Sequence, residues 1–305
     1  MIPVLLLLLL AAAPLQEAMI KAAAPARGRV GAAAVVLEEG ETASIGGSER
    51  FPMQSVYKFP IAMAVLAEVD AGRMRLAQTV RVEASDLVTA GQHSPIRDEH
   101  PHGAADYTLA EILRLNVSES DGTACDVLLR LLGGTVRVQN YLNSLGIETV
   151  RVATTEKAMG LDENAQYKNW ATPLGAVALL RAFYEGKGLS VASRSLLLKL
   201  MTESPTGPKR LKGLLPADAV VAHKTGTSRT LGGVTAATND IGIITLCDGR
   251  HAAVAVFISD SHATTEAREG VIAGIAREVW ERNRAGCESS SPWRKWSGSK
   301  NGAGM

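Results

Sequence analysis

A serine and a lysine three residues apart are the first residues in this 305-residue chain that could carry out chemistry together. They are Ser55 and Lys58, and the apolar stretch that follows them predicts a helix from Ser55 to about Ala71. Residues three apart on a helix share a face, so the lysine can reach the serine hydroxyl. Such a hydroxyl is a good nucleophile once a nearby base, here a desolvated lysine, takes its proton. The alternative is a serine that only caps the helix.

Two further residues, Ser120 and Glu156, could move protons. Ser120 precedes Asp121, between a predicted helix that ends near Asn116 and another that begins at Thr123. In a functional role Ser120 would pass a proton to a leaving nitrogen, whereas in a structural role this segment would only cap the second helix. Glu156 could activate a water molecule as a general base, although an isolated loop glutamate is ordinarily a surface residue.

A predicted strand from Ala219 to Ser228 carries a third polar segment, which is Lys224-Thr225-Gly226-Thr227-Ser228. A glycine inside a strand often marks the close approach of another backbone or a ligand. Lys224 would add positive charge to a cleft, and the backbone N–H groups of Ser55 and Thr227 could form an oxyanion hole. The alternative is an edge strand that a lysine protects from pairing.

Strand patterns near both ends of the chain enclose a long helical region. The other expected strands are two within Val30–Ile45, then Asp240–Leu246 and Ala252–Ser259. The other expected helices are Leu109–Asn116, Gly122–Leu132, Pro173–Tyr184 and Thr265–Arg282. We therefore expect an α/β (α+β) fold, with one antiparallel five-stranded sheet built from both chain ends and flanked by helices. An inserted all-α domain would face it across a ligand cleft.

The N-terminal residues indicate that the protein is exported. Val4–Ala13 is an apolar run too short to span a bilayer comfortably, and its three final alanines resemble a cleavage site. We therefore expect a signal peptide over 1–13 and a periplasmic or secreted protein. The alternative to a signal peptide is a buried N-terminal helix. A short helix is expected from Gln16 to Ala24. The expected domains are α/β over 14–54 and 201–285, all-α over 55–200, and a disordered tail over 286–305.

Composition argues against several other classes of protein. The net charge is +1, from 32 basic and 31 acidic residues, and no basic stripe suggests a nucleic-acid partner. The histidines lack metal-site spacing; His100 and His102 could face one ion but are better interpreted as a solvated loop. We expect no metal and no cofactor. Cys125 is expected to be a core thiol, and a disulfide between Cys247 and Cys287 remains open.

The order and spacing of these segments resemble the class A serine β-lactamases, whose set is S-x-x-K, S-D-N and K-T-G. The separations from Ser55 to Ser120, Glu156 and Lys224 are 65, 36 and 68 residues in turn. The resemblance covers roughly Leu15 to Arg282 and extends to Phe59-Pro60, Ser94-Pro95 and Thr123-Ala124. The stretches 166–170 and 238–242 look like the extended-spectrum branch. The resemblance implies a serine β-lactamase/DD-peptidase-like fold.

The resemblance also assigns catalytic roles. It implies that Ser55 opens the β-lactam of penicillins and cephalosporins and becomes acylated. Either Lys58 or Glu156 would be the base for acylation, and Glu156 would activate the water that removes the acyl group. Ser120 would pass the proton to nitrogen, beside Lys224. The expected consequence is resistance to β-lactam antibiotics, in a monomer with no stable membrane anchor.

Binding residues follow from the same resemblance. They are His93, Gly122, Arg210, Thr225, Gly226, Thr227 and Ser228. Thr225 and Thr227 would hold the substrate carboxylate, and Arg210 corresponds to a carboxylate-binding arginine of some members. The alternative for Arg210 is a solvated residue in a basic run with Lys209 and Lys212. His93 stands where the family often has an aromatic wall of the cleft.

Three departures from the family pattern bear on activity. Gly122 replaces an asparagine that contacts substrate, and Gly160 replaces one that helps Glu156 to hold water, which should slow deacylation for some substrates. Gln54 and Ser228 stand where carbapenem-hydrolysing relatives form a disulfide, so strong carbapenem hydrolysis is not expected.

Two other functions remain possible on the same fold. One is a penicillin-binding DD-peptidase, which shares the nucleophile and the KTG strand but lacks a base that clears the adduct. The other is a non-catalytic sensor of β-lactams or cell-wall fragments. Glu156 argues against both, because a protein that stays acylated has no use for a water-activating carboxylate.

Overall fold

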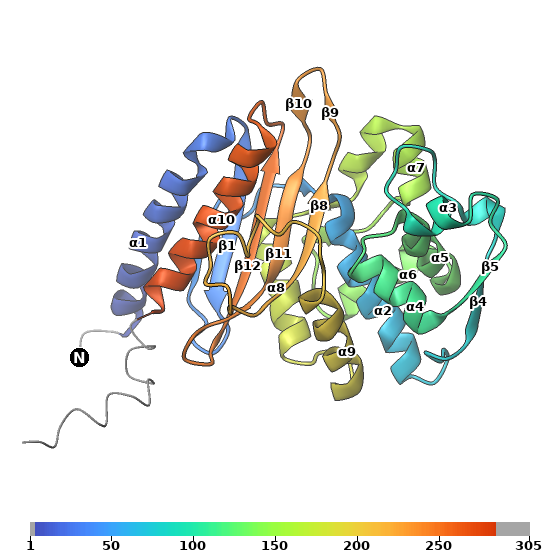
Figure 1. Cartoon of the computed structure of the whole chain (residues 1–305). Coiled ribbons are helices and arrows are strands. Elements are labelled where there is room, and N and C mark those ends of the chain that lie inside the picture. The colour runs from blue at the N-terminus through green and yellow to red at the C-terminus, as the bar shows by residue number, and fades with distance from the viewer. Residues whose placement is uncertain (1–3, 285–305) are drawn as a thin grey trace, which may run out of the picture.

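Five antiparallel strands form the central sheet, in the order β2-β1-β12-β11-β8 (Figure 1). The computed structural model describes residues 4–284, and for residues 4–13 it describes the backbone alone. The strands are β1 (Arg29–Val36), β2 (Thr42–Ile45), β8 (Val221–Thr227), β11 (Thr238–Thr245) and β12 (His251–Ser259). They lie close to the predicted positions. The expectation of an antiparallel five-stranded sheet built from both chain ends is confirmed.

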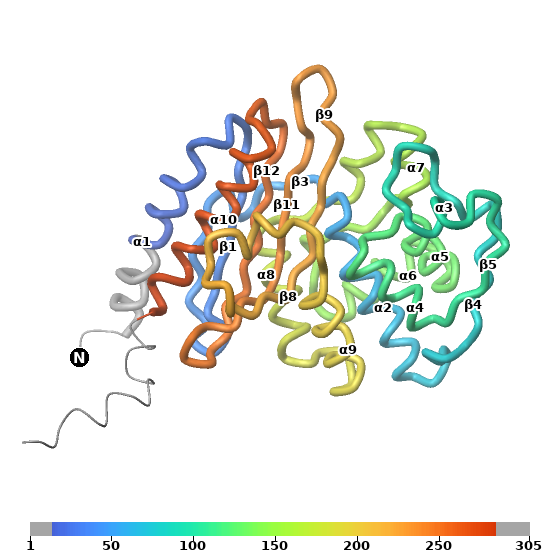
Figure 2. The backbone as a smooth tube through the Cα atoms, in the orientation of Figure 1, coloured from blue at the N-terminus to red at the C-terminus, as the bar shows by residue number. Residues whose placement is uncertain are grey.

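Strand β1 pairs with β12, so segments more than 200 residues apart lie side by side in Figure 2. The register joins Arg29 to Ser259 and Val36 to Ala252. All residues of β12 from Ala252 to Ser259 are buried. A strand covered on both faces can be apolar at every position, which explains its unbroken hydrophobic run.

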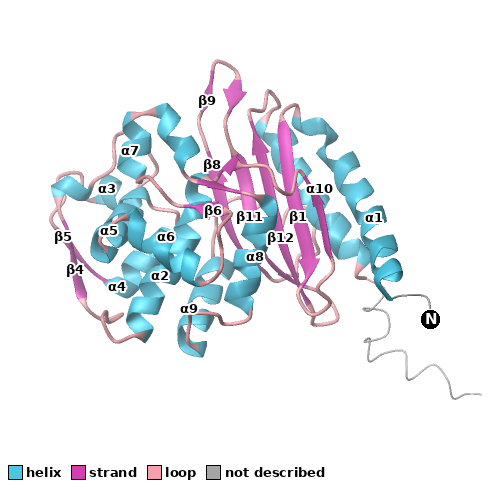
Figure 3. Ribbon diagram, turned by 180° about the vertical axis from the view of Figure 1, so that it is seen from behind, coloured by secondary structure: helices cyan, strands magenta, loops and turns pink. Residues whose placement is uncertain are grey.

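Helices cover both faces of this sheet (Figures 1 and 3). On one face lie α1 (Val4–Ala23) and α10 (Thr265–Arg282), and their core with the sheet includes Met19, Val256 and Ile275. The other face is covered by α8 (Pro173–Tyr184) and adjoins the helical block, where Phe51 stacks on Phe257 with ring centroids 6.0 Å apart.

The helical block surrounds α2 (Lys58–Asp70), whose residues from Lys58 to Leu66 are all buried. A helix that is apolar on all sides packs inside a bundle, as this one does. Around it lie α3 (Pro95–Glu99), α4 (Leu109–Val117), α5 (Gly122–Leu132), α6 (Thr135–Ser144), α7 (Glu156–Leu161) and α9 (Val191–Thr202). The short 3₁₀ helices are η1 (Ala24–Ala26), η2 (Gln54–Tyr57), η3 (Ala84–Asp86) and η4 (Glu163–Lys168).

The block also contains short strands that the sequence analysis did not predict, so it is not purely helical. One pair is β4 (Thr79–Val82) with β5 (Ala105–Thr108), and a three-stranded group joins β3 (Phe51–Pro52), β7 (Trp170–Ala171) and β6 (Val150–Arg151). A hairpin of β9 (Thr230–Leu231) and β10 (Val234–Thr235) follows β8. Two-residue strands are too short to produce an alternating pattern, since they are set by contacts with distant segments.

The chain ends differ from expectation in one respect. The helix predicted from Gln16 begins earlier, because α1 runs without a break from Val4 to Ala23, across the expected cleavage point. The expected tail over 286–305, and Cys287 with it, lies outside the described residues. Cys125 is a buried free thiol, as predicted. Within residues 4–284, no helix is both long enough and apolar enough to cross a membrane.

Candidate active site

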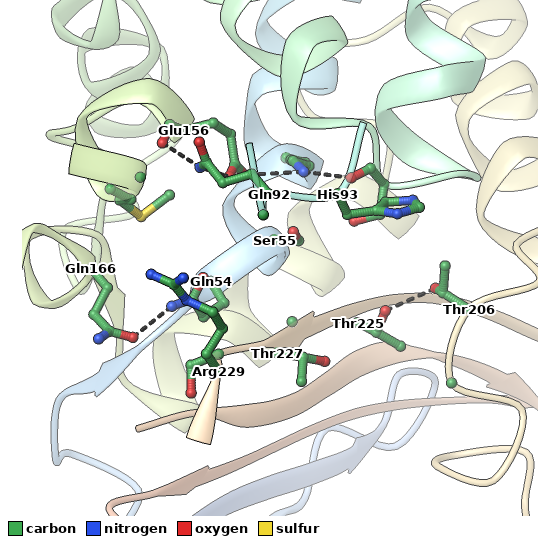
Figure 4. Close-up of a pocket in the computed structure, with 18 of the residues that line it drawn as sticks. Gln54, Ser55, Gln92, His93, Glu156, Gln166, Thr206, Thr225, Thr227 and Arg229 are labelled. Carbon is green, nitrogen blue, oxygen red and sulfur yellow. Dashed lines mark hydrogen bonds and ion pairs between the residues drawn. The ribbon is translucent and has the colours of Figure 1, made fainter. Parts of the chain in front are cut away.

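A cavity of about 420 Å³ opens where β8, the start of α2 and the α7 segment meet (Figure 4). It contains the predicted catalytic residues Ser55, Lys58, Ser120 and Glu156. The predicted binding residues that line it are His93, Arg210, Thr225, Gly226, Thr227 and Ser228. Lys224 and Gly122 are buried beside the cavity and do not line it.

Ser55 lies in the 3₁₀ turn η2, immediately before α2. It caps neither element, since their N-cap residues are Met53 and Tyr57 and neither cap uses a side chain. The simple capping interpretation of Ser55 is therefore wrong. Gln54, directly before it, has a φ of +47°, a left-handed conformation that a residue other than glycine rarely adopts. Strain of this kind is common at functional sites.

The turn η2, which carries Ser55, packs closely against strands β8 and β11 of the sheet. Gly226 approaches it so closely that an added Cβ would lie 2.3 Å from the Met53 carbonyl oxygen. On the next strand, Asn239 pairs with Gly226 and donates from its side-chain amide to the carbonyls of Pro52 (2.8 Å) and Met53 (3.0 Å). The glycine thus brings the end of β8, with Thr227, against η2, as a shared oxyanion hole requires.

Lys58 is almost fully buried at the start of α2. Within the described chain its ammonium donates to the Ser120 carbonyl (2.6 Å) and pairs with Glu156 Oε1 (3.0 Å), rather than binding the Ser55 hydroxyl. Burial is the largest single influence and lowers the pKa of Lys58, but the nearby charges, that of Glu156 above all, together with the hydrogen bond to Glu156 outweigh it, and the net pKa is raised. In the resting protein Lys58 therefore keeps its proton.

Lys224 lies behind Ser120 and donates to its hydroxyl at 2.9 Å. Although β8 is the edge strand of the sheet, Lys224 is fully buried, so its interpretation as a solvated edge lysine is wrong. Burial and the nearby charge of Lys58 lower the pKa of Lys224 to about 7. Ser120 is a second left-handed residue, with φ of +62°. The next residue, Asp121, caps α5 by accepting from the Ala124 N–H, as the structural alternative predicted.

Glu156 is the first residue of α7 and is buried, in contrast to a surface loop glutamate. Its backbone N–H and that of Lys157 both donate to the Asp126 carboxylate, at 2.8 and 2.9 Å. Burial raises the pKa of Asp126 to about 6. The Gln92 amide also contacts Glu156, at its carbonyl (2.5 Å) and at Oε2 (3.4 Å). Glu156 is therefore held through its backbone by Asp126 and Gln92, and through its carboxylate by Lys58 and Gln92.

Arg210 is only 5% exposed, so its interpretation as a solvated residue is wrong. Its guanidinium donates to the Thr227 hydroxyl (2.8 Å), to the backbone carbonyls of Gly226 and Asn239, and to Glu269 (3.2 Å). Because Arg210 occupies the Thr227 oxygen as a donor, the Thr227 proton is left to point elsewhere, toward the cavity it lines.

His93 and Gly122 meet through the backbone. Gly122 N–H donates to the His93 carbonyl at 2.9 Å, and an added Cβ at Gly122 would lie 3.2 Å from that oxygen. The His93 ring is exposed at the cavity wall and contacts the Glu119 carbonyl at 2.8 Å. The structure therefore brings His93 to the cavity, but it places Gly122 behind this loop.

Four residues of the site were not identified from sequence as functional: Gln92, Asp126, Glu163 and Arg229. Arg229, after β8, forms an ion pair with Glu163 of η4 across the mouth of the cavity. Asn239 belongs to a stretch noted in the resemblance, but its clamp on η2 was not foreseen. In the sequence these residues stand out only as polar residues next to a motif or inside an apolar segment. Because such residues are common, they do not identify a functional role.

This fold, with a serine at the start of α2 facing a cleft between sheet and helical block, defines the class A serine β-lactamases. The family model described as "Beta-lactamase enzyme family" matches residues 14–282, and the chain belongs to this family. It is 43% identical to β-lactamase VEB-1 of Pseudomonas aeruginosa, over 83% of this chain and 84% of that protein. With extended-spectrum β-lactamase PER-1 of the same organism it shares 44% identity, over 76% and 75%.

The solved structures that resemble this chain are also β-lactamases. The TLA-1 extended-spectrum β-lactamase superposes with a TM-score of 0.86 at 42% identity, covering 89% of this chain and 98% of that one. A β-lactamase from Chitinophaga pinensis DSM 2588 superposes with a TM-score of 0.85 at 46% identity, covering 88% and 99%. The predicted resemblance to class A β-lactamases, including their extended-spectrum members, is confirmed.

Proposed function

We propose that this protein hydrolyses the cyclic amide of penicillins and cephalosporins through an acyl-enzyme on Ser55, and so confers β-lactam resistance. The observation that carries this proposal is the buried Glu156 carboxylate, which is paired with Lys58 in the cavity that Ser55 lines. A site that only becomes acylated needs a nucleophile and donors for the oxyanion. A site that turns over also needs a base for water.

In the acylation step, the Ser55 oxygen attacks the lactam carbonyl and its proton passes to a base. Since Lys58 holds its proton at rest, we assign the accepting role to Glu156, acting through water. The backbone N–H groups of Ser55 and Thr227 stabilise the oxyanion. When the C–N bond breaks, Ser120 donates its proton to the lactam nitrogen, while Lys224 donates a hydrogen bond to the Ser120 oxygen. The proton that Glu156 accepted from Ser55 then passes to Ser120 by way of Lys58, which contacts both residues, so Ser120 is again a hydroxyl and Glu156 is again an ionised base for deacylation.

In the deacylation step, Glu156 takes a proton from water as the water attacks the ester carbonyl of acylated Ser55. The ester bond to Ser55 breaks, the proton returns to the serine oxygen, and the ring-opened acid leaves. The substrate carboxylate is held by Thr225 and Thr227, with the Arg210 guanidinium behind Thr227. Because Gln54 and Ser228 replace the disulfide positions of carbapenem-hydrolysing relatives, we propose that carbapenems are poor substrates.

We further propose that the protein acts as a monomer in the periplasm or outside the cell, after removal of residues 1–13. The apolar run and its terminal alanines support this. So does the position of Met19, because the segment that would remain supplies this buried residue to the core beneath α1.

The proposed function is tested by steady-state hydrolysis of a chromogenic cephalosporin by the purified protein and by Glu156→Ala, with mass spectrometry of both. We expect fast turnover by the wild type and a stable acyl-enzyme in the variant. Ser55→Ala should abolish covalent labelling by penicillin. A wild type that acylates once and stalls would favour a DD-peptidase or a sensor, and labelling that survives in Ser55→Ala would remove Ser55 as nucleophile.

A further inference from the structure

The side chain of Gln92 is half-buried at the cavity wall and all its polar atoms have partners. Its oxygen accepts from the Thr89 N–H (3.1 Å) and the Thr89 hydroxyl (2.8 Å). Its nitrogen donates to the Glu156 carbonyl (2.5 Å) and lies 3.4 Å from Glu156 Oε2. Figure 4 shows the two side chains facing each other across the cavity wall. The contact joins segments 64 residues apart in the chain.

The orientation of this amide is determined by its neighbours. The Thr89 backbone N–H can only donate, so the oxygen of the Gln92 amide must face it. The carbonyl and the ionised carboxylate of Glu156 can only accept, so the amide nitrogen must face Glu156. Because Lys58 contacts Oε1 and Gln92 contacts Oε2, each carboxylate oxygen has its own cationic or N–H neighbour.

The loop that carries Gln92 is itself held in place. One guanidinium nitrogen of Arg97 donates to the backbone carbonyls of Thr89 and Gln92, both at 2.7 Å. The Gln92 N–H also bonds to the Thr89 carbonyl at 3.2 Å. The amide is therefore presented to Glu156 by a closed turn with an internal arginine clamp, in which the side chain loses little freedom on making the contact.

Gly160 provides the space for this amide. It lies four residues after Glu156 on α7, on the same helix face. A Cβ added at position 160 would lie 2.2 Å from Gln92 Oε1 and 2.3 Å from Thr89 Oγ1. Any side chain at position 160 would therefore displace the Gln92 amide, so the glycine and the glutamine form a matched pair.

We propose that Gln92 is a positioning residue for the Glu156 general base, and that Gly160 is present to admit it. This inference rests on the proposed function. In this chain a glutamine from the loop before α3 supplies the amide next to the water-activating carboxylate. It fixes one oxygen of Glu156 and so leaves the other, beside Lys58, aligned toward the acylated serine.

The direct test compares deacylation rate constants of the wild type, Gln92→Ala and Gln92→Glu, from the decay of the acyl-enzyme by mass spectrometry. We expect at least a 10-fold decrease in Gln92→Ala, a fraction of what general-base catalysis contributes. Gln92→Glu keeps the length and the contacts to Thr89 but turns an oxygen toward Glu156, so a larger decrease is expected. The control is Gln78→Ala, whose amide accepts from the Arg75 N–H away from the cavity.

A second background separates positioning from general loss of structure. In Glu156→Ala there is no carboxylate to position, so adding Gln92→Ala should change the residual deacylation rate less than 2-fold. Gly160→Asn should slow deacylation in the wild type, because its side chain collides with Gln92. In a background with both Gln92→Ala and Thr89→Ala, which removes the two side-chain oxygens that the added Cβ would meet, the same change should restore part of the rate, because an asparagine amide then has room to reach Glu156.

The outcomes are distinguishable. Equal slowing by Gln92→Ala with and without Glu156 would overturn the positioning role, as would an unchanged deacylation rate in both Gln92 variants of a protein that turns over. A wild type that never forms or never clears an acyl-enzyme would remove the proposed function and this inference with it. Non-additive losses at Gln92, Gly160 and Glu156 would establish the inference.

Discussion

At the scale of single residues, the Lys224–Ser120 hydrogen bond sets the expected pH dependence. The pKa of Lys224 is lowered to about 7 by burial and by Lys58, so its ammonium form is present below pH 7 and is lost above it. The ammonium can only donate, which leaves the Ser120 proton for the cavity. The neutral amine can accept that proton and withdraw it from the leaving nitrogen.

We therefore expect kcat/KM to fall as the pH rises through about 7, since this parameter follows groups of the free enzyme. In Lys224→Arg the falling part of the profile should move to higher pH by more than about one unit, because a guanidinium stays charged in this range. The measurement is kcat/KM between pH 5.5 and 9.5, with the exposed Lys199→Arg as control. A profile for Lys224→Arg that overlays the wild type would contradict this role.

Arg210 combines binding and structure, because it joins β8 and β11 to Glu269 on α10. Arg210→Ala should raise KM for carboxylate-bearing penicillins at least about 5-fold, through loss of the charge behind Thr227. It should also lower the free energy of unfolding by about 3 kcal/mol, since Glu269 is left largely buried without its partner. Both are compared with Lys209→Ala, the exposed neighbour. An unchanged KM with lowered stability would make Arg210 purely structural.

At the scale of elements, hydrophobic periodicity together with capping residues predicted the long helices well. The helices α5, α8 and α10 have the predicted bounds, and each begins after a side chain that accepts a backbone N–H: Asp121, Thr172 and Thr264. These signals are local, so they are readable in a single sequence. The paired two-residue strands β3, β6 and β7 have no such signal, because contacts across the fold define them.

The difference between local sequence signals and contacts across the fold also explains which residues of the site could be predicted. Ser55, Lys58 and the β8 segment belong to short motifs whose order in the chain is informative. The role of Gln92 depends on an absent side chain at Gly160, 68 residues away, and that of Asp126 on two N–H groups 30 and 31 residues away. Such pairs have no characteristic spacing, so only the folded arrangement reveals them.

The contact between β8 and η2 gives a prediction at this scale. Gly226→Ala should lower the acylation rate at least about 100-fold, because the new Cβ would lie 2.3 Å from the Met53 carbonyl and push Thr227 away from Ser55. Acylation is measured by stopped flow with a chromogenic cephalosporin. Gly270→Ala is the matched control, since nothing lies within 4 Å of its added Cβ. Acylation at the wild-type rate would show that β8 tolerates displacement and that the oxyanion hole lies elsewhere.

At the scale of the whole molecule, the two ends of the chain complete one core. Strand β1 pairs with β12, and α1 packs beside α10 over the same face of the sheet (Figure 1). Met19 is fully buried in this core, and Leu15 and Ala22 pack against it. The catalytic turn η2 follows directly from this N-terminal segment. The segment therefore completes the β2–β1 side of the sheet, while Thr227 meets Ser55 at the opposite edge, on β8.

This arrangement predicts that two N-terminal truncations differ sharply. Removing residues 1–13 should leave the melting temperature and turnover unchanged, because the first described core residue of α1 is Leu15. Removing residues 1–23 takes away Met19 and uncovers the apolar side of α10. Burial of one methionine is worth about 2–3 kcal/mol, so with its neighbours the loss should reach about 3 kcal/mol or more. For a domain of this size that lowers the melting temperature by roughly 10 °C.

The melting temperatures of both truncated proteins and of the full chain are compared by differential scanning calorimetry. Equal melting temperatures would mean that α1 is dispensable, whereas a loss already on removing 1–13 would place the stabilising contacts within the expected signal peptide and contradict its removal.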